Sequence, residues 1–104
     1  MEKSETNYEI REQLKHLIIN NAIKWGQGIS TRGRPSRWIF DNREILLTPK
    51  GAYLTAKLFF EKLKNFKFDS VGGMTLAADP IVSSLVALSN FNGMKINGFI
   101  IRKE

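Results

Sequence analysis

The 104-residue sequence predicts an α/β domain in which helices cover parallel strands. Two strand-like runs, at 68–71 and 95–101, flank an apolar helical stretch over 79–89 that ends before Asn92-Gly93. Strand, helix and strand in such a short segment are typical of a right-handed βαβ unit with parallel strands. Two helical patterns also precede this unit in the sequence.

The first helix is predicted over 7–25. Thr6 and Glu9 stand at the spacing of a capping box. Gly26 follows as a plausible C-cap. The apolar stripe at helical spacing consists of Ile10, Leu14, Leu17, Ile18 and Trp25.

A basic turn and a short strand separate this helix from the next. The turn belongs to the segment 27–43, and the β-prone run is 37–40. Thr48 is the expected N-cap of the second helix, with Pro49 at its first position. Its expected buried face consists of Ala52, Ala56, Phe59, Phe60 and Leu63.

Composition changes near Asn65, from a basic helical part to an apolar part. We therefore divide the sequence into a helical part, 1–65, and the βαβ part, 66–104, and expect one compact domain. The apolar helix over 79–89 has almost no polar face, so we expect it to lie between the sheet and another helix or another chain.

Charge and composition narrow the classes of function. The formal net charge of +6 favours an anionic partner, either nucleic acid or a phosphorylated metabolite. The sequence has no cysteine and one histidine, which excludes disulfides, thiolate metal sites and His-rich sites. It shows neither a signal-peptide pattern nor an apolar run of the roughly 20 residues that span a bilayer, so we expect a cytoplasmic protein with no membrane partner.

The glycine-containing segment 72–79 is the first candidate site. Glycine allows the backbone N–H groups to approach an anion, and the following helix N-terminus adds a favourable dipole. The segment matches neither the Walker pattern nor the dinucleotide fingerprint. Asp79, the expected N-cap of the helix over 79–89, complicates an anion site because its carboxylate competes with phosphate. A tight strand-to-helix turn without a ligand is the equally weighted alternative.

Two further clusters carry positive charge. Arg32, Arg34 and Arg37 alternate with aromatic residues, a pattern that can bind phosphate and stack on a base, although a solvated basic loop is the more ordinary interpretation. The segment 98–104 places Arg102 and Lys103 at the carboxyl end of a predicted parallel strand, where such sheets place their sites. A solubilising strand end is the alternative.

These clusters, in this order, resemble the orotate phosphoribosyltransferase family. The family has a loop of the form S-G-R-x-S-x-aromatic, which is similar to residues 32–38 here. Some members carry V-G-G-[LM]-T-L-G-A-D-P, from which the segment 71–80 differs only at Ala77. A strand ending F-[IV]-[VI]-R-K-[EA] is matched by 99–104. The resemblance covers about residues 8–104 and implies a partial type I phosphoribosyltransferase fold.

The resemblance implies a reaction and a set of binding residues. The family transfers ribose 5-phosphate from phosphoribosyl pyrophosphate to orotate, with Mg²⁺, and releases pyrophosphate. It places Arg34, Ile39 and Phe40 on the orotate side. It assigns no catalytic residue and no metal ligand to this sequence. The residues that it places along the pyrophosphate are Gly73, Met74, Thr75, Leu76, Ala77, Ala78, Arg102 and Lys103.

The sequence also departs from the family pattern. Thr31 stands where many members of the family carry a lysine, and Ala77 stands where some carry one in the glycine turn. The family's mobile loop and acidic V-D-D signature are missing. We therefore expect a truncated and inactive orotate phosphoribosyltransferase. A non-catalytic protein that binds a phosphometabolite, nucleotide or partner chain is the alternative. Nucleic acid is disfavoured because the basic residues are scattered. Uncovered strand edges and apolar helix faces predict at least a homodimer.

Overall fold

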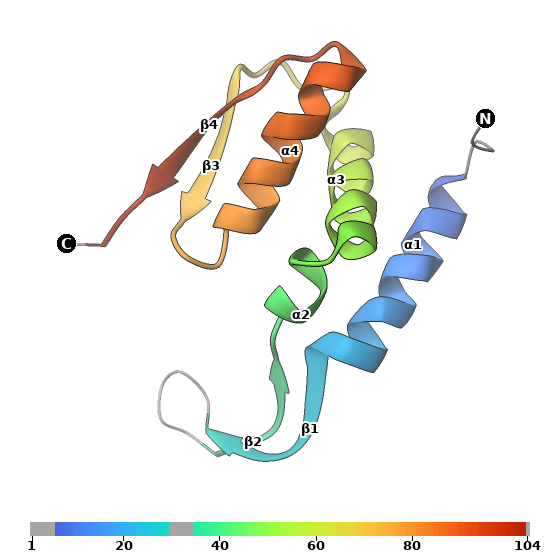
Figure 1. The fold of residues 1–104 in the computed structure, drawn as a ribbon, viewed down its shortest axis with the longest axis vertical. Helices are drawn as coiled ribbons and strands as arrows, with labels where there is room; N and C mark the ends of the chain where they lie inside the picture. The colour runs from blue at the N-terminus through green and yellow to red at the C-terminus, as the bar shows by residue number, and fades with distance from the viewer. Residues whose placement is uncertain (1–5, 30–34, 104) are drawn as a thin grey trace.

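The computed structural model describes residues 6–29 and 35–103. Figure 1 shows helices α1, α3 and α4 side by side, a hairpin extending beyond them, and a second pair of strands against α4. The elements in chain order are α1 (Asn7–Leu17), the π-helical turn η1 (Ile18–Ala22), β1 (Ile23–Ile29), β2 (Pro35–Phe40), α2 (Arg43–Leu46), α3 (Pro49–Leu63), β3 (Ser70–Met74), α4 (Asp79–Asn92) and β4 (Asn97–Ile101).

The first helix begins as predicted but ends earlier. The backbone N–H of Glu9 donates a 3.1 Å hydrogen bond to Oγ1 of Thr6, as expected of an N-cap. α1 ends at Leu17, η1 follows, and the chain is extended from Ile23 onward. The predicted helix over 7–25 is therefore wrong in its last three residues.

Pairing across the hairpin explains this difference. β1 is antiparallel to β2, with Ile23 opposite Phe40 and Trp25 opposite Trp38. Such β-branched and aromatic cross-strand pairs stabilise a sheet. Trp25 is 73% exposed and is not part of a buried helical stripe. Gly26, the expected helix cap, lies in β1 with φ of 122°, at a shift in the strand register. The strand expected over 37–40 is confirmed within β2.

α3 begins at the predicted cap. The backbone N–H of Gly51 donates a 3.1 Å hydrogen bond to Oγ1 of Thr48, and Pro49 is the first helical residue. The sequence did not predict α2, which packs against α3. The buried stripe of α3 is therefore centred nearer to Leu54 than the sequence predicted. The buried residues are Gly51, Leu54, Thr55, Ala56 and Phe60. Of the predicted face, Ala56 and Phe60 are buried, Ala52 and Leu63 are half-buried, and Phe59 is exposed.

The parallel βαβ unit is confirmed, with shifted boundaries. β3 pairs with β4 in parallel, and Gly72 lies opposite Phe99. The predicted strand over 68–71 starts two residues later and continues to Met74, so both glycines belong to the strand. The pairing explains why position 72 is a glycine: a Cβ atom there would overlap the ring of Phe99. Glycine here makes room for an aromatic ring on the neighbouring strand.

The start of α4 differs from the prediction by one position, because Asp79 was expected to be the N-cap. Ala78 occupies the N-cap position without a side-chain hydrogen bond, and Asp79 is the first helical residue. The expectation that Asp79 caps the helix is therefore wrong, because Thr75 engages its carboxylate instead. The helix continues past residue 89 to Asn92 and ends at Gly93, whose φ of 75° is left-handed.

Two hydrophobic clusters hold the helices together. One contains Ala56 and Phe60 of α3, Leu85 of α4 and Ile96 before β4. The other consists of Ala22, Ile45 and Leu46. Ser89 of α4 is also buried, and its Oγ donates to the carbonyl of Val86 at 2.7 Å and accepts from the N–H of Ile96 at 2.9 Å. α4 thus lies between the β3–β4 sheet and α3, as predicted.

Candidate functional site

The turn between β3 and α4 is built from backbone hydrogen bonds. The N–H of Thr75 donates to the carbonyl of Ile101 at 3.0 Å, which joins the start of the turn to the end of β4. The N–H of Ala78 donates to the carbonyl of Met74 at 3.1 Å. The N–H of Asp79 donates to the carbonyl of Leu76 at 3.2 Å. The peptide bond between Thr75 and Leu76 is cis.

Two amides of the turn remain for a ligand. The N–H groups of Leu76 and Ala77 donate to no acceptor among the residues that the structure describes. Both residues are exposed, and they lie just before Ala78, the N-cap of α4. Successive unpaired backbone N–H groups beside a helix N-terminus favour an anion, through hydrogen bonding and through the helix dipole.

A side-chain hydrogen bond crosses the same turn. Oγ1 of Thr75 donates to Oδ2 of Asp79 at 2.6 Å. The other carboxylate oxygen, Oδ1, is buried and has no hydrogen-bond partner among the described residues. The carboxylate that complicates an anion site is therefore tied to the turn through Thr75, and its negative charge stays close to the site.

Positive charge lies at the same edge of the sheet. Met74 pairs with Ile101, so the ends of the two parallel strands lie together. Arg102 and Lys103 directly follow β4, and both are exposed. The structure thus brings the predicted pyrophosphate-side residues, 73–78 with 102 and 103, to one edge.

The predicted orotate-side residues lie in the other sheet. Ile39 and Phe40 belong to β2, and the two residues are 40% and 48% exposed. Figure 1 shows that the hairpin extends beyond the helices, on the side of the molecule toward which β3 and β4 point. Arg34 lies outside the described residues.

Asp41 fixes the base of the hairpin, a role that sequence reasoning missed. Its N–H donates to the carbonyl of Ala22 at 2.7 Å, and its Oδ1 accepts from Nε of Arg43 at 3.1 Å. The hydrogen bond from Arg43 holds the pKa of the Asp41 carboxyl below its usual range, helped by the nearby charge of Lys24. The Asp-x-Arg spacing was the available signal in the sequence.

Comparisons with known proteins agree on one family, although no family model matches the chain. The orotate phosphoribosyltransferase of Aquifex aeolicus is 35% identical over 97 residues, covering 90% of this chain and 53% of the relative. The Corynebacterium glutamicum enzyme is 32% identical over 104 residues, covering 100% and 55%.

Solved structures give the same result. The Mycobacterium tuberculosis orotate phosphoribosyltransferase in complex with 5-phospho-α-D-ribosyl 1-diphosphate matches with a TM-score of 0.74 at 26% identity, over 90% of this chain and 54% of that one. A Corynebacterium diphtheriae phosphoribosyltransferase matches with a TM-score of 0.78 at 26% identity, over 92% and 52%. The chain spans about half the length of these proteins. Over nearly all of its length, it is similar in sequence and fold to half of an orotate phosphoribosyltransferase.

Proposed function

We propose that these residues form the part of an orotate phosphoribosyltransferase that binds the pyrophosphate group of phosphoribosyl pyrophosphate. The observation that carries the proposal is the pair of unpaired amides at Leu76 and Ala77, beside the cationic Arg102. A relative of similar fold has been solved with this substrate. Its diphosphate is the type of anion that such a turn favours.

The proposed role in the reaction is stabilisation of the leaving group. As the bond to C1 of the ribose breaks, negative charge develops on the departing pyrophosphate. Fixed N–H donors at Leu76 and Ala77, with Arg102 and Lys103, would lower the energy of that charge. Orotate would contact Ile39, Phe40 and Arg34, as the resemblance implies.

The proposal also includes Mg²⁺, which would be bound to the substrate and not to a site of its own on the protein. The described residues contain no group of three or more His, Cys, Asp or Glu side chains that could hold a metal ion. Asp79 is the one carboxylate in the turn itself, and Thr75 binds one of its oxygens. These residues do not make a resident metal site, so we propose that Mg²⁺ arrives bound to the pyrophosphate oxygens.

The location of the protein follows from the same proposal. None of the helices in residues 6–29 and 35–103 is long and apolar enough to cross a membrane. Phosphoribosyl pyrophosphate and orotate are charged, water-soluble metabolites, and we propose that the protein meets them in the cytoplasm.

Calorimetric titration with pyrophosphate and with phosphoribosyl pyrophosphate, each with Mg²⁺, tests the proposal. We expect weak but saturable binding. Arg102→Ala should weaken it about tenfold or more, since a hydrogen bond to a charged group contributes roughly 1.5–3 kcal/mol. Arg11→Ala is the matched control, because it removes the same charge from an exposed position on α1. Absence of heat and of thermal stabilisation at millimolar ligand would contradict the proposal.

A non-catalytic phosphometabolite-binding protein is the second candidate function. It is favoured by one observation: the glycine-containing turn holds Ala77 where, by the resemblance, some members of the family carry a lysine. Both candidates predict pyrophosphate binding. They differ in whether orotidine monophosphate is formed once the remaining half of the fold is supplied.

A further inference from the structure

A small pocket lies where three helices meet. It has a volume of about 270 Å³ and lies between the start of α1, the second half of α3 and the end of α4. In Figure 1 this is the upper end of the molecule, away from the hairpin. α4 has 14 residues, or about 21 Å of helix, and the turn after β3 lies at its other end. The pocket and the candidate pyrophosphate site are therefore well separated.

The floor of the pocket is apolar. Ile10 of α1 and Phe60 of α3 are 3% and 7% exposed, and Met94, which follows α4, is half-buried. Removing a hydrocarbon group from water onto such a surface is favourable. A methionine also adapts its shape and contacts an aromatic ring favourably. The floor is therefore suited to the apolar part of a ligand, and to a ring in particular.

Polar side chains form the rim of the pocket. They are Lys57, Glu61 and Lys64 of α3, Asn7 at the start of α1 and Asn92 at the end of α4. Lys64 and Asn7 both lower the pKa of the Glu61 carboxyl, so this group is ionised at neutral pH. Two ammonium groups and one carboxylate leave the rim with a single net positive charge.

Lys57 is the cation of the rim that lacks a counter-ion. Glu61, one turn along α3, accepts a 2.6 Å hydrogen bond from Nζ of Lys64. Lys57 is half-buried, yet its ammonium group forms no salt bridge with the residues that the structure describes. Its Nζ lies 5.9 Å from the centroid of the Tyr53 ring, at the outer limit of a cation–π contact. Since an ammonium group has three N–H donors, Lys57 can still donate to an acceptor in the pocket.

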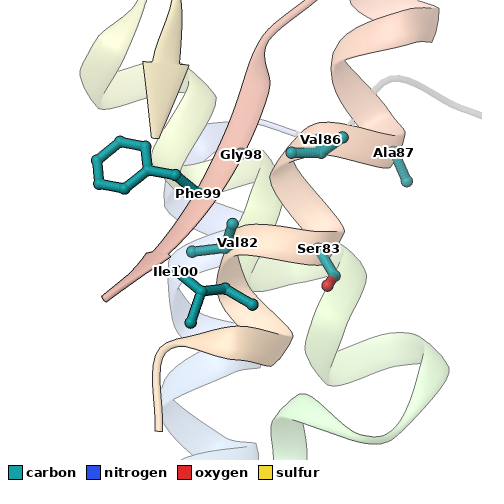
Figure 2. Close-up of a pocket in the computed structure, with 7 residues that line it drawn as sticks. All are labelled: Val82, Ser83, Val86, Ala87, Gly98, Phe99 and Ile100. Carbon is teal, nitrogen blue, oxygen red and sulfur yellow. The ribbon is translucent and has the colours of Figure 1, made fainter. Parts of the chain in front are cut away.

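The larger groove in Figure 2 lacks this combination of groups. It lies between α4 and β4 and has a volume of about 500 Å³. Of the 7 residues that line it, only Ser83 has a polar side chain, and none is charged. Specific small-molecule sites combine apolar walls with a few placed polar groups. The smaller pocket meets that description and the groove does not.

We propose that the pocket between α1, α3 and α4 binds a small aromatic monocarboxylate. The ring lies on the apolar floor, and the carboxylate accepts hydrogen bonds from Nζ of Lys57 and from the side-chain amide of Asn92. The single net positive charge of the rim matches a monoanion, whereas Glu61 would repel the second charge of a phosphate monoester. A volume just below the roughly 300–1,000 Å³ of drug-sized sites suits a ligand with one ring. This site is independent of the proposed function.

The test is a titration of the 104-residue protein with sodium benzoate, followed by two-dimensional amide NMR. We expect saturable shifts, with a Kd in the millimolar range, at the amides of Phe60, Asn92 and Met94. Benzyl alcohol keeps the ring without the charge, and acetate keeps the charge without the ring. Each should bind at least about tenfold more weakly than benzoate. Phenyl phosphate, which carries a second negative charge, should also bind more weakly.

Variants of one lysine identify the contact. Lys57→Met removes the ammonium group, keeps the length of the side chain and should weaken benzoate binding at least about tenfold. Lys57→Arg keeps the charge and should bind benzoate within about threefold of the unchanged protein. Lys62→Met is the matched control, because it removes the same charge from an exposed position on α3 that does not line the pocket. Thermal melts check that all three variants are folded.

Several outcomes would overturn the proposal. These are the absence of saturable shifts, equal affinities for benzoate and benzyl alcohol, and equal affinities of Lys57→Met and Lys62→Met for benzoate. Pyrophosphate provides a further check, because it is proposed to bind at the other end of α4. It should not displace benzoate. Displacement, or shifts confined to the turn after β3, would place the carboxylate at the pyrophosphate site and not in this pocket.

Discussion

The hydroxyl of Thr75 and the carboxylate of Asp79 are joined by a 2.6 Å hydrogen bond across the turn between β3 and α4. It closes the segment that carries the unpaired amides of Leu76 and Ala77. A turn held in this way loses less conformational freedom when an anion binds. Asp79 thereby stabilises the turn, while its negative charge would oppose the proposed pyrophosphate ligand and Arg102 and Lys103 would attract it.

Thr75→Val should weaken pyrophosphate binding about tenfold, because it removes the donor to a charged acceptor without changing the shape of the side chain. Thr75→Ser keeps a hydroxyl and should bind within about twofold of the unchanged protein, since the serine hydroxyl can donate the same hydrogen bond. Calorimetry measures both. Equal affinities for the valine and serine variants would show that the hydrogen bond does not position the turn.

Gly73→Ala should abolish measurable pyrophosphate binding. A Cβ atom at Gly73 would lie 2.6 Å from Cβ of Ala78, so the turn must move away from the strand. The melting temperature should change much less than the affinity, because the turn is largely exposed. Ser70→Ala, at the exposed start of β3, is the control. Unchanged affinity in Gly73→Ala would mean that the anion binds elsewhere.

Gly51→Ala should destabilise the fold by about 1–3 kcal/mol, the range expected of overpacking in a well-packed interior. A Cβ atom there would overlap the backbone carbonyl oxygen of Ile45, and would lie 2.8 Å from Oγ1 of Thr48. These neighbours are a backbone carbonyl group and the side chain of the N-cap residue, which cannot rotate away. Urea unfolding of Gly51→Ala beside Lys50→Ala, an exposed neighbour, measures the effect. Equal midpoints would contradict the close approach of α2 and α3.

Glu61→Gln should lower stability at neutral pH but not at low pH. Nζ of Lys64 donates a 2.6 Å hydrogen bond to the Glu61 carboxylate, and this contact, with help from Asn7, lowers the pKa of Glu61 below its usual 4.5. A lowered folded-state pKa stabilises the protein above the unfolded value, and the benefit disappears as pH falls through the folded value. Melting temperatures at about pH 7 and about pH 3 check this. A difference that persists at the acidic pH would point to packing instead.

The chain alone should not make orotidine monophosphate at a measurable rate. The groups that would bind the ribose hydroxyls and close over the reacting centre are not among its residues. Losing orientation forfeits a large part of the roughly 7–11 kcal/mol that positioning can supply. The assay follows loss of orotate absorbance with phosphoribosyl pyrophosphate and Mg²⁺. Turnover within about tenfold of a median enzyme rate would refute this prediction.

The sequence predicted α3 and the βαβ unit well because their signals are local. The cap at Thr48, the stop at Gly93 and the two β-prone runs act within a few residues of themselves. The helix over 7–25 was overextended because Trp25 falls on the helical stripe by spacing alone. Its partner, Trp38, is distant in the sequence, and pairing between β1 and β2 decided the outcome.

Part of the candidate site could likewise be predicted from the sequence, and part could not. The turn and Arg102 could be placed together from the sequence, since parallel strands end at one edge. The position of Ile39 and Phe40 relative to that edge could not, because it depends on how two separate sheets are held by the helices between them. The Thr75–Asp79 bond was missed because Asp79 was assigned to the helix cap.

Ile81 packs against both hydrophobic clusters, the one around Phe60 and the one around Ile45. It lies two residues after Asp79, in the first turn of α4. Unfolding of either cluster removes the packing contacts on one side of Ile81, so the helical part and the βαβ part lose stability together. The change in composition near Asn65 is consequently no boundary in the folded protein: Ile81 connects the first turn of α4, next to the turn after β3, to both clusters.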